Sequence, residues 1–255
     1  AGGSRVPELM PYVWRGVAAL LCAASLAGCA VPDPSRGEVG RYKLARPEAT
    51  RWTEIPVGEL FQAPPTVAGE SGAIPMRTRA WGLPAADGAW QAVVLLHVGD
   101  AGRSTATSWA TVCPQQRGLL VRDAAGGSAT RIDCLRLRRW AMVEGWFERQ
   151  RPDLARWAQQ QSVRLGGSPA LVSHMFTTPS GELLMLDLLV DQVLVRPETR
   201  GNDAFLRAGI PAQDWSERVA QAVREATGMI DGHLLLPDFP FISHLSPPLV
   251  PRTSP

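Results

Sequence analysis

The sequence of 255 residues is poor in several residue types that mark particular protein classes. Lys43 is its one lysine, tyrosine occurs twice and cysteine four times, and 26 basic residues nearly balance 24 acidic ones. A dedicated nucleic-acid-binding domain usually has a clear basic excess, so a formal net charge of +2 argues against nucleic acid as a partner. The 45% hydrophobic content excludes a wholly disordered chain and is sufficient for one sizeable core.

The sequence also lacks the short motifs of common enzyme classes. It contains no Gly-x-Ser-x-Gly nucleophile elbow and no zinc-binding motif. The segment 97–105 contains two glycines and follows a predicted strand, but it has neither the spacing nor the lysine of a phosphate-binding loop. We therefore expect no cofactor and no metal site, and we favour a non-enzymatic protein.

The most apolar uncharged run near the N-terminus, residues 16–27, is short. A helix that crosses about 30 Å of hydrocarbon needs about 20 residues, which this run does not provide. With Arg15 before it, the run is typical of the hydrophobic region of a signal peptide. We predict a signal peptide over 1–28 and interpret the residues before Met10 as leader.

The run ends in Leu26-Ala27-Gly28-Cys29, which resembles the lipobox of bacterial lipoproteins. In that family the cysteine thiol receives a diacylglycerol and the chain is cut before it, so the resemblance implies lipidation of Cys29. Ala30, rather than aspartate, follows, which implies sorting to the outer membrane with the body on the periplasmic side. Several acyl chains, at about 0.8 kcal/mol per buried CH₂, make a stable membrane anchor. The alternative is an ordinary signal peptide in which Cys29 is incidental.

The remaining cysteines form an even set. Cys22 leaves with the signal peptide and Cys29 carries lipid, so Cys113 and Cys134 are left in an oxidising compartment. We predict a disulfide between them. It closes a loop of about 22 residues and contributes about 3 kcal/mol in the chain-entropy model. The alternative is two free buried thiols.

The rest of the chain is predicted to form one α+β domain over 71–236, after a lipidated tether over 29–70 and before a proline-rich tail over 237–255. Runs of strands followed by helices favour a mainly antiparallel sheet with about three helices packed on it. The expected strands are 74–81, 90–98, 104–113, 119–122, 130–137, 170–177, 182–195 and 234–236. The expected helices are two short ones within 138–163, broken near Gln150 with the second beginning at Pro152, and one over 214–227 that starts with an Asp214 and Glu217 capping box.

One pair of residues is a candidate for catalysis. A hairpin turn centred on Pro179 and Ser180 would place His174 opposite Met185, and His174 and Asp187 would then be diagonal neighbours on one face. A histidine and an aspartate form part of hydrolytic triads. A slip of one residue would separate them onto opposite faces, and the alternative role is a structural hydrogen bond.

Three residues are candidates for binding. Arg136 and Arg138 share one face of a strand and could contact an acidic partner or lipid phosphates; the alternative is a solvated basic edge. Trp52 is the tryptophan that we most expect to be exposed, and an exposed indole could stack on a sugar, whereas the others are assigned to the core.

Together these features predict a lipid-anchored, outer-membrane lipoprotein facing the periplasm. Its expected role is non-enzymatic binding or assembly with an envelope protein. The first alternative is a module that binds peptidoglycan or a small ligand. The second is a hydrolase that uses a His/Asp site.

Overall fold

The computed structural model describes residues 2, 43–45, 52–57, 74, 76–99, 108–138, 148–149, 151–165, 169–228 and 233–242. The helices and strands that the structure describes lie in one compact unit, Glu38–Pro255. Apart from Gly2, the predicted signal peptide lies outside the described residues, and so do Cys29, most of the tether and the tail beyond residue 242. Among the described helices, none has the length and apolar character needed to cross a membrane.

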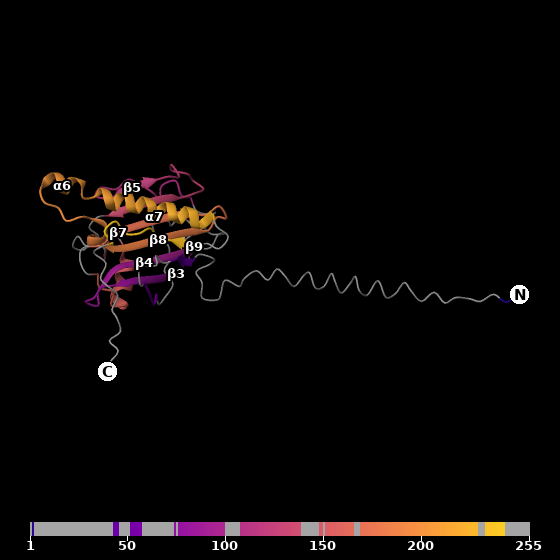
Figure 1. Ribbon diagram of the computed structural model, residues 1–255. Coiled ribbons are helices and arrows are strands. Elements are labelled where there is room, and N and C mark those ends of the chain that lie inside the picture. The colour runs from indigo at the N-terminus through magenta and orange to yellow at the C-terminus, as the bar shows by residue number, and fades with distance from the viewer. Residues whose placement is uncertain are drawn as a thin grey trace, which may run out of the picture. The chain divides into compact units, whose positions relative to one another are not determined.

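The centre of the fold is a seven-stranded sheet in the order β2-β3-β4-β8-β7-β6-β5 (Figure 1). Each neighbouring pair is antiparallel, which confirms the predicted α+β class with a mainly antiparallel sheet. A separate parallel pair joins β1 to β9. The strands are β1 (Lys43–Ala45), β2 (Thr53–Ile55), β3 (Met76–Pro84), β4 (Trp90–Gly99), β5 (Leu120–Asp123), β6 (Asp133–Arg138), β7 (Pro169–Thr177), β8 (Leu183–Asp191) and β9 (His233–Leu235).

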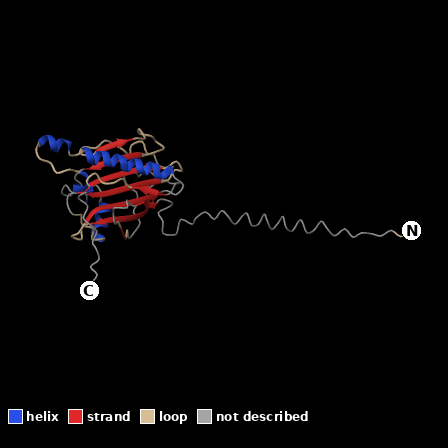
Figure 2. Cartoon of the chain, in the orientation of Figure 1, coloured by secondary structure: helices blue, strands red, loops and turns tan. Residues whose placement is uncertain are grey.

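Helices cover both faces of this sheet. The longest helix among the described residues, α7 (Ile210–Gly228), runs across one face (Figures 1 and 2), where Val219 and Val223 join the apolar cluster of Val94 on β4. On the other face, α4 (Pro152–Gln160) contributes Leu154 and Trp157 to a second cluster. Two short helices, α5 (Gln192–Val195) and α6 (Asn202–Arg207), lie between β8 and α7 in the chain.

The central strand β8 is buried on both faces. Its alternate residues Leu184, Leu186, Leu188 and Val190 belong to the cluster under α7, as the sequence pattern predicted. The residues between them face the α4 side and are buried as well: Leu183, Met185, Asp187 and Leu189. A strand that is covered on both faces requires a nearly continuous apolar run. The one charged residue within this run, Asp187, therefore needs a hydrogen-bonding or ionic partner.

Three predicted elements differ from the structure. Where it is described, the expected strand over 104–113 forms a turn, in which the amide of Val112 donates to the Trp109 carbonyl at 3.1 Å. The side chains of Trp109 and Val112 are both buried. The apolar pattern that predicted a strand therefore comes from a turn that packs against the core. Strand β8 ends at Asp191 rather than residue 195, because the Asp191 carboxylate accepts a hydrogen bond from the Val193 amide and caps α5.

Helix α7 begins at Ile210, four residues before the predicted start. Asp214 is therefore an exposed residue inside the helix, and the capping box with Glu217 is wrong. Pro211 suits the first turn of a helix, where its missing N–H has no intrahelical acceptor to lose. The predicted start of α4 at Pro152 is confirmed.

Candidate functional site

A network of buried polar side chains lies on the α4 face of the sheet. Thr78 of β3 faces His97 of β4 across the strand pair, and the Thr78 hydroxyl is 2.8 Å from His97 Nδ1. Leu95 faces Asp187 of β8, so His97 is diagonal to this carboxylate. His97 Nε2 lies 3.3 Å from Asp187 Oδ2. A hydroxyl, an imidazole and a carboxylate are thus aligned across three neighbouring strands.

Arg151 completes the network from the residue that precedes α4. Its Nη1 and Nη2 donate to the two carboxylate oxygens of Asp187 at 2.8 and 2.9 Å. Its Nε and Nη2 also donate to Asp153, in the first turn of α4, at 3.1 and 2.8 Å. One guanidinium therefore bridges a carboxylate on the sheet and a carboxylate on the helix, and so fixes the start of α4 over β8.

Burial and neighbouring charges shift the pKa values of Asp187 and Arg151 in opposite directions. Burial alone would raise the pKa of Asp187, but the Arg151 charge and hydrogen bonds from His97 and Arg151 hold that pKa well below its usual range. Burial alone would lower the pKa of Arg151, but Asp187 and Asp153 raise it above its usual value. Both groups stay ionised, and the Asp187 side chain has no exposed surface.

The predicted pair of His174 and Asp187 is not brought together. Ser173 faces Asp187 and His174 faces Leu186, so His174 and Asp187 lie on opposite faces of the sheet. The hairpin loop has five residues between Thr177 and Leu183 and is centred on Ser180. Gly181 adopts a φ of 83° there, and the Thr178 amide donates to the Glu182 carbonyl at 2.9 Å. The expected register was therefore wrong by one residue.

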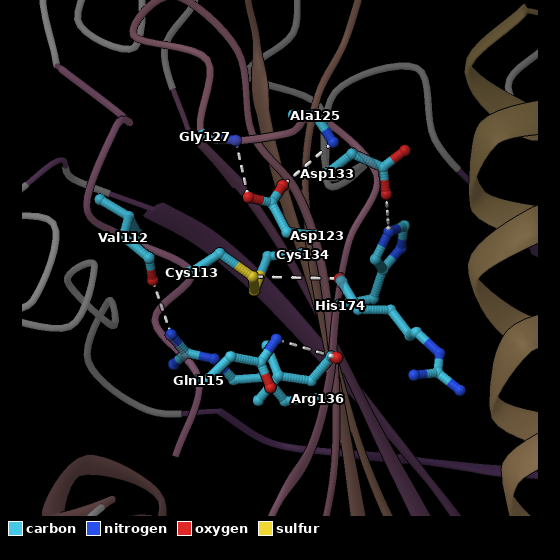
Figure 3. The surroundings of a disulfide bond; sticks show 12 residues. Val112, Cys113, Gln115, Asp123, Ala125, Gly127, Asp133, Cys134, Arg136 and His174 are labelled. Atoms are coloured by element: carbon cyan, nitrogen blue, oxygen red, sulfur yellow. Dashed lines mark hydrogen bonds and ion pairs between the residues drawn. A yellow bond between two sulfur atoms is a disulfide. The ribbon is translucent and has the colours of Figure 1, made fainter.

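His174 belongs to a second network on the α7 face. Its Nε2 lies 2.9 Å from Asp133 Oδ1 of β6 (Figure 3). Arg224 of α7 donates to both oxygens of Asp133, from Nε at 2.7 Å and from Nη2 at 3.0 Å. Burial would raise the pKa of Asp133, but hydrogen bonds and charge from His174 and Arg224 lower it to about 2. For His174 burial dominates and lowers the pKa, despite the nearby carboxylate.

The predicted disulfide is confirmed. Cys113 and Cys134 are joined at an S–S distance of 2.02 Å with 5.7 Å between their Cα atoms (Figure 3). It ties the turn that precedes β5 to strand β6. In the same turn the Val112 carbonyl accepts a hydrogen bond from Arg136 Nη2 at 2.6 Å, and Gln115 Nε2 donates to the Val121 carbonyl at 3.4 Å. Covalent and polar contacts therefore hold this turn against the sheet.

The arginine candidates do not lie on a sheet edge. Strand β6, which carries Arg136 and Arg138, is flanked by β7 and β5. Burial lowers the pKa of both arginines, and the nearby Arg151 charge lowers that of Arg136 further. Arg136 is thus a half-buried group that holds the disulfide turn, and the interpretation as a solvated edge was wrong.

Trp52 is buried rather than exposed, with 4% of its surface accessible. The centroid of its ring lies 6.5 Å from that of Phe239, which follows β9. The Phe239 ring in turn stacks on Trp215 of α7, with 5.2 Å between the ring centroids. The prediction failed because the segment after β9 covers this site from far along the chain. The other described tryptophans that are buried are Trp81, Trp109, Trp157 and Trp215.

Sequence reasoning missed Thr78, His97 and Arg151. His97 and Asp187 each interrupt an apolar run on a strand that is buried on both faces, and a buried polar group of this kind needs a partner. These interruptions could have predicted a contact between His97 and Asp187. No feature of the sequence indicated that Arg151 would join them. Across the residues that the structure describes, no group of three or more His, Cys, Asp or Glu side chains could hold a metal ion.

Comparison with known proteins gives no relative. No family model, no curated protein and no solved structure matches this chain.

Proposed function

We propose that this protein is a bacterial envelope lipoprotein, acylated at Cys29 and anchored in the outer membrane, whose α+β body has a binding or assembly role in the periplasm. The observation that carries the proposal is the Cys113–Cys134 disulfide. Structural disulfides persist in oxidising compartments such as the periplasm, which is where the Leu26-Ala27-Gly28-Cys29 sequence would direct the body.

A binding role, rather than catalysis, is supported by how the buried charges are used. Asp187 and Asp133 each accept two hydrogen bonds from one arginine, Arg151 and Arg224 respectively. Each pair joins a helix or its N-cap residue to a strand. These carboxylates are thereby engaged in holding α4 and α7 on the sheet, which is a structural use of the charged groups.

The location is tested by fractionating cells that express the full chain with Cys29→Ala. We expect the wild-type protein in the outer-membrane fraction with incorporated fatty acid, and Cys29→Ala without label in the soluble fraction. Cys22→Ala is the matched control, because it removes a thiol from the same segment outside the lipobox-like sequence, and it should behave as wild type. Retention of Cys29→Ala in the outer membrane would contradict the anchor.

The binding role is tested by cross-linking the tagged protein in cells and identifying the captured chains by mass spectrometry. One dominant envelope protein, captured from wild type well above background, is the expected result. Capture of nothing above background would count against an assembly role.

Hydrolysis is the second candidate, since the Thr78 hydroxyl, the His97 ring and the Asp187 carboxylate follow the order of groups in a catalytic triad. Thr78 is 6% exposed, and both oxygens of Asp187 are held by Arg151. The comparison of Thr78→Val with Thr78→Ser separates the two roles. If the cellular phenotype is lost in the first and retained in the second, at equal stability, catalysis is favoured over binding.

A further inference from the structure

The network of Asp133, His174 and Arg224 connects three elements of the α7 face. Asp133 lies on β6, His174 on β7 and Arg224 near the end of α7. The carboxylate accepts from Arg224 at 2.7 and 3.0 Å and contacts His174 Nε2 at 2.9 Å. Gln221, one turn earlier on α7, accepts from Arg224 Nη1 at 3.3 Å and orients the guanidinium. The network thus adds polar contacts to the apolar packing of Val223 and Ala226, which also hold the C-terminal half of α7 on the sheet.

The histidine is held in one protonation state by its surroundings. Its side chain has no exposed surface, and Nε2 faces an ionised carboxylate, so Nε2 carries the proton of the neutral ring. Within the described part of the chain, Nδ1 is buried and has no hydrogen-bond partner. A second proton would have to go to Nδ1, where there is no described acceptor.

The charged groups that face His174 are Asp133 from β6 and Arg224 from α7. Strand β8 presents Leu186 directly opposite, and on β7 the Phe176 ring lies 6.0 Å from the imidazole. A protonated His174 would be a second cation on a carboxylate that Arg224 already occupies, in apolar surroundings. Its charge would lose hydration without gaining a new partner, so protonation is easier once the network opens.

We infer that Asp133, His174 and Arg224 form a pH-sensitive latch, which holds the C-terminal half of α7 on β6 and β7 at neutral pH and loosens as His174 takes up a proton. This role is independent of where the protein resides. Loosening uncovers apolar side chains beneath α7, which are Leu135, Leu137 and Val172.

The direction follows from linkage. Burial lowers the pKa of His174 from its ordinary value of 6.5, so the unfolded or opened state binds a proton more readily than the closed state. The contribution of neutral His174 to the stability of the latch is therefore complete above about pH 6.5, and it is lost as the pH falls from there through the lowered pKa of the folded state. One titrating proton changes the opening constant by at most about tenfold per pH unit.

Hydrogen exchange of the full chain between pH 7.5 and pH 5.0 tests this, after correction for the intrinsic pH dependence of exchange. We expect the opening constants of amides in 217–227 to rise as the pH falls, relative to those of α4 as an internal reference. His174→Gln keeps a donor for Asp133 but cannot titrate in this range, so it should remove the rise. His97→Gln, on the opposite face of the sheet, is the matched control and should retain it.

The inference is overturned if α7 exchange does not change over this range, or if the rise persists in His174→Gln. If His174→Gln fails to fold, the wild-type protein alone can test the inference. The protonation of the His174 ring is then followed by NMR over the same pH range as the exchange of α7. Protonation of His174 without a parallel change in α7 exchange overturns the latch, and coincident midpoints support it.

Discussion

Arg151 and Asp187 form a bidentate ion pair, in which both carboxylate oxygens of Asp187 accept hydrogen bonds from one guanidinium. The Asp187 side chain has no exposed surface. The arginine precedes α4 and the aspartate lies in the middle of β8, so the pair fixes a helix to the central strand of the sheet, which is buried on both faces. The attraction offsets a large desolvation cost on both groups. Losing one member is therefore expected to cost more than losing both.

Replacing Arg151 alone leaves Asp187 as a buried charge beside His97. We expect Arg151→Met to lower the free energy of unfolding by about 3–5 kcal/mol. The double variant Arg151→Met/Asp187→Leu should recover most of this loss, because neither charge is then buried without a partner. Urea unfolding followed by tryptophan fluorescence gives both values. A double variant less stable than the single one would show that the pair contributes a net attraction beyond the cost of desolvation.

Asp133 should contribute stability that disappears in acid. Its pKa is about 2 in the folded protein against 3.8 for a free side chain, which corresponds to about 2 kcal/mol. Because the folded-state pKa is lowered, this contribution is present above about pH 4 and is lost as the pH falls toward 2. The stability difference between wild type and Asp133→Asn should shrink over that window. A difference that is constant from pH 5 to pH 2 would contradict the assignment.

The disulfide should be a large part of the stability of the β5–β6 edge. Cys113→Ala/Cys134→Ala removes a crosslink between residues 21 apart in sequence, and we expect a loss of about 3 kcal/mol. Hydrogen exchange should increase most in β5 and β6, and less in β3, which lies near the other edge. Thiol labelling of denatured, unreduced wild-type protein should find both cysteines blocked. Two labelled thiols would contradict the bond.

Gly82 of β3 is a position where a side chain does not fit. A Cβ there would overlap the ring of Trp90 and lie 2.8 Å from Ile55 Cδ1. We expect Gly82→Ala to destabilise the protein by about 1–3 kcal/mol through overpacking. In a Trp90→Leu background the same change should cost clearly less, since the ring is gone. An equal cost in both backgrounds would place the cause in the backbone rather than in the contact with Trp90.

The strands that could be predicted from the sequence are those whose pattern is dictated by burial. The run over 90–98 and the alternation of Leu184, Leu186 and Leu188 reflect strands covered by other layers. The first strand was correct within one residue, and so was the start of the second, although that strand ends at Asp191 rather than residue 195. The disulfide followed from counting cysteines. These features depend on local sequence or on composition, which one chain is enough to reveal.

The polar sites could not be predicted in the same way, because they depend on register and on distant partners. A five-residue loop in place of a four-residue one moved His174 to the opposite face from Asp187. Arg151 reaches Asp187 across 36 positions, and Arg224 reaches Asp133 across 91. Trp52 is covered by Phe239, at the far end of the chain. Such contacts are set by tertiary packing and leave no local pattern.

The strand order has a consequence for how the protein could be divided. Strands β2, β3 and β4 follow one another in the sheet as they do in the chain, and so do β5, β6, β7 and β8. Among the described strands of this sheet, the two series pair along β4 and β8, where eight residue pairs run from Ala92 with Val190 to Gly99 with Leu183. This central seam joins residues 84 to 98 positions apart in the chain, from Gly99 with Leu183 to Ala92 with Val190, so its closure has the highest loop entropy in the sheet. Two polypeptides separated between β4 and Cys113 would each retain a complete strand series, and their reassociation along this seam would make the protein a natural candidate for fragment complementation.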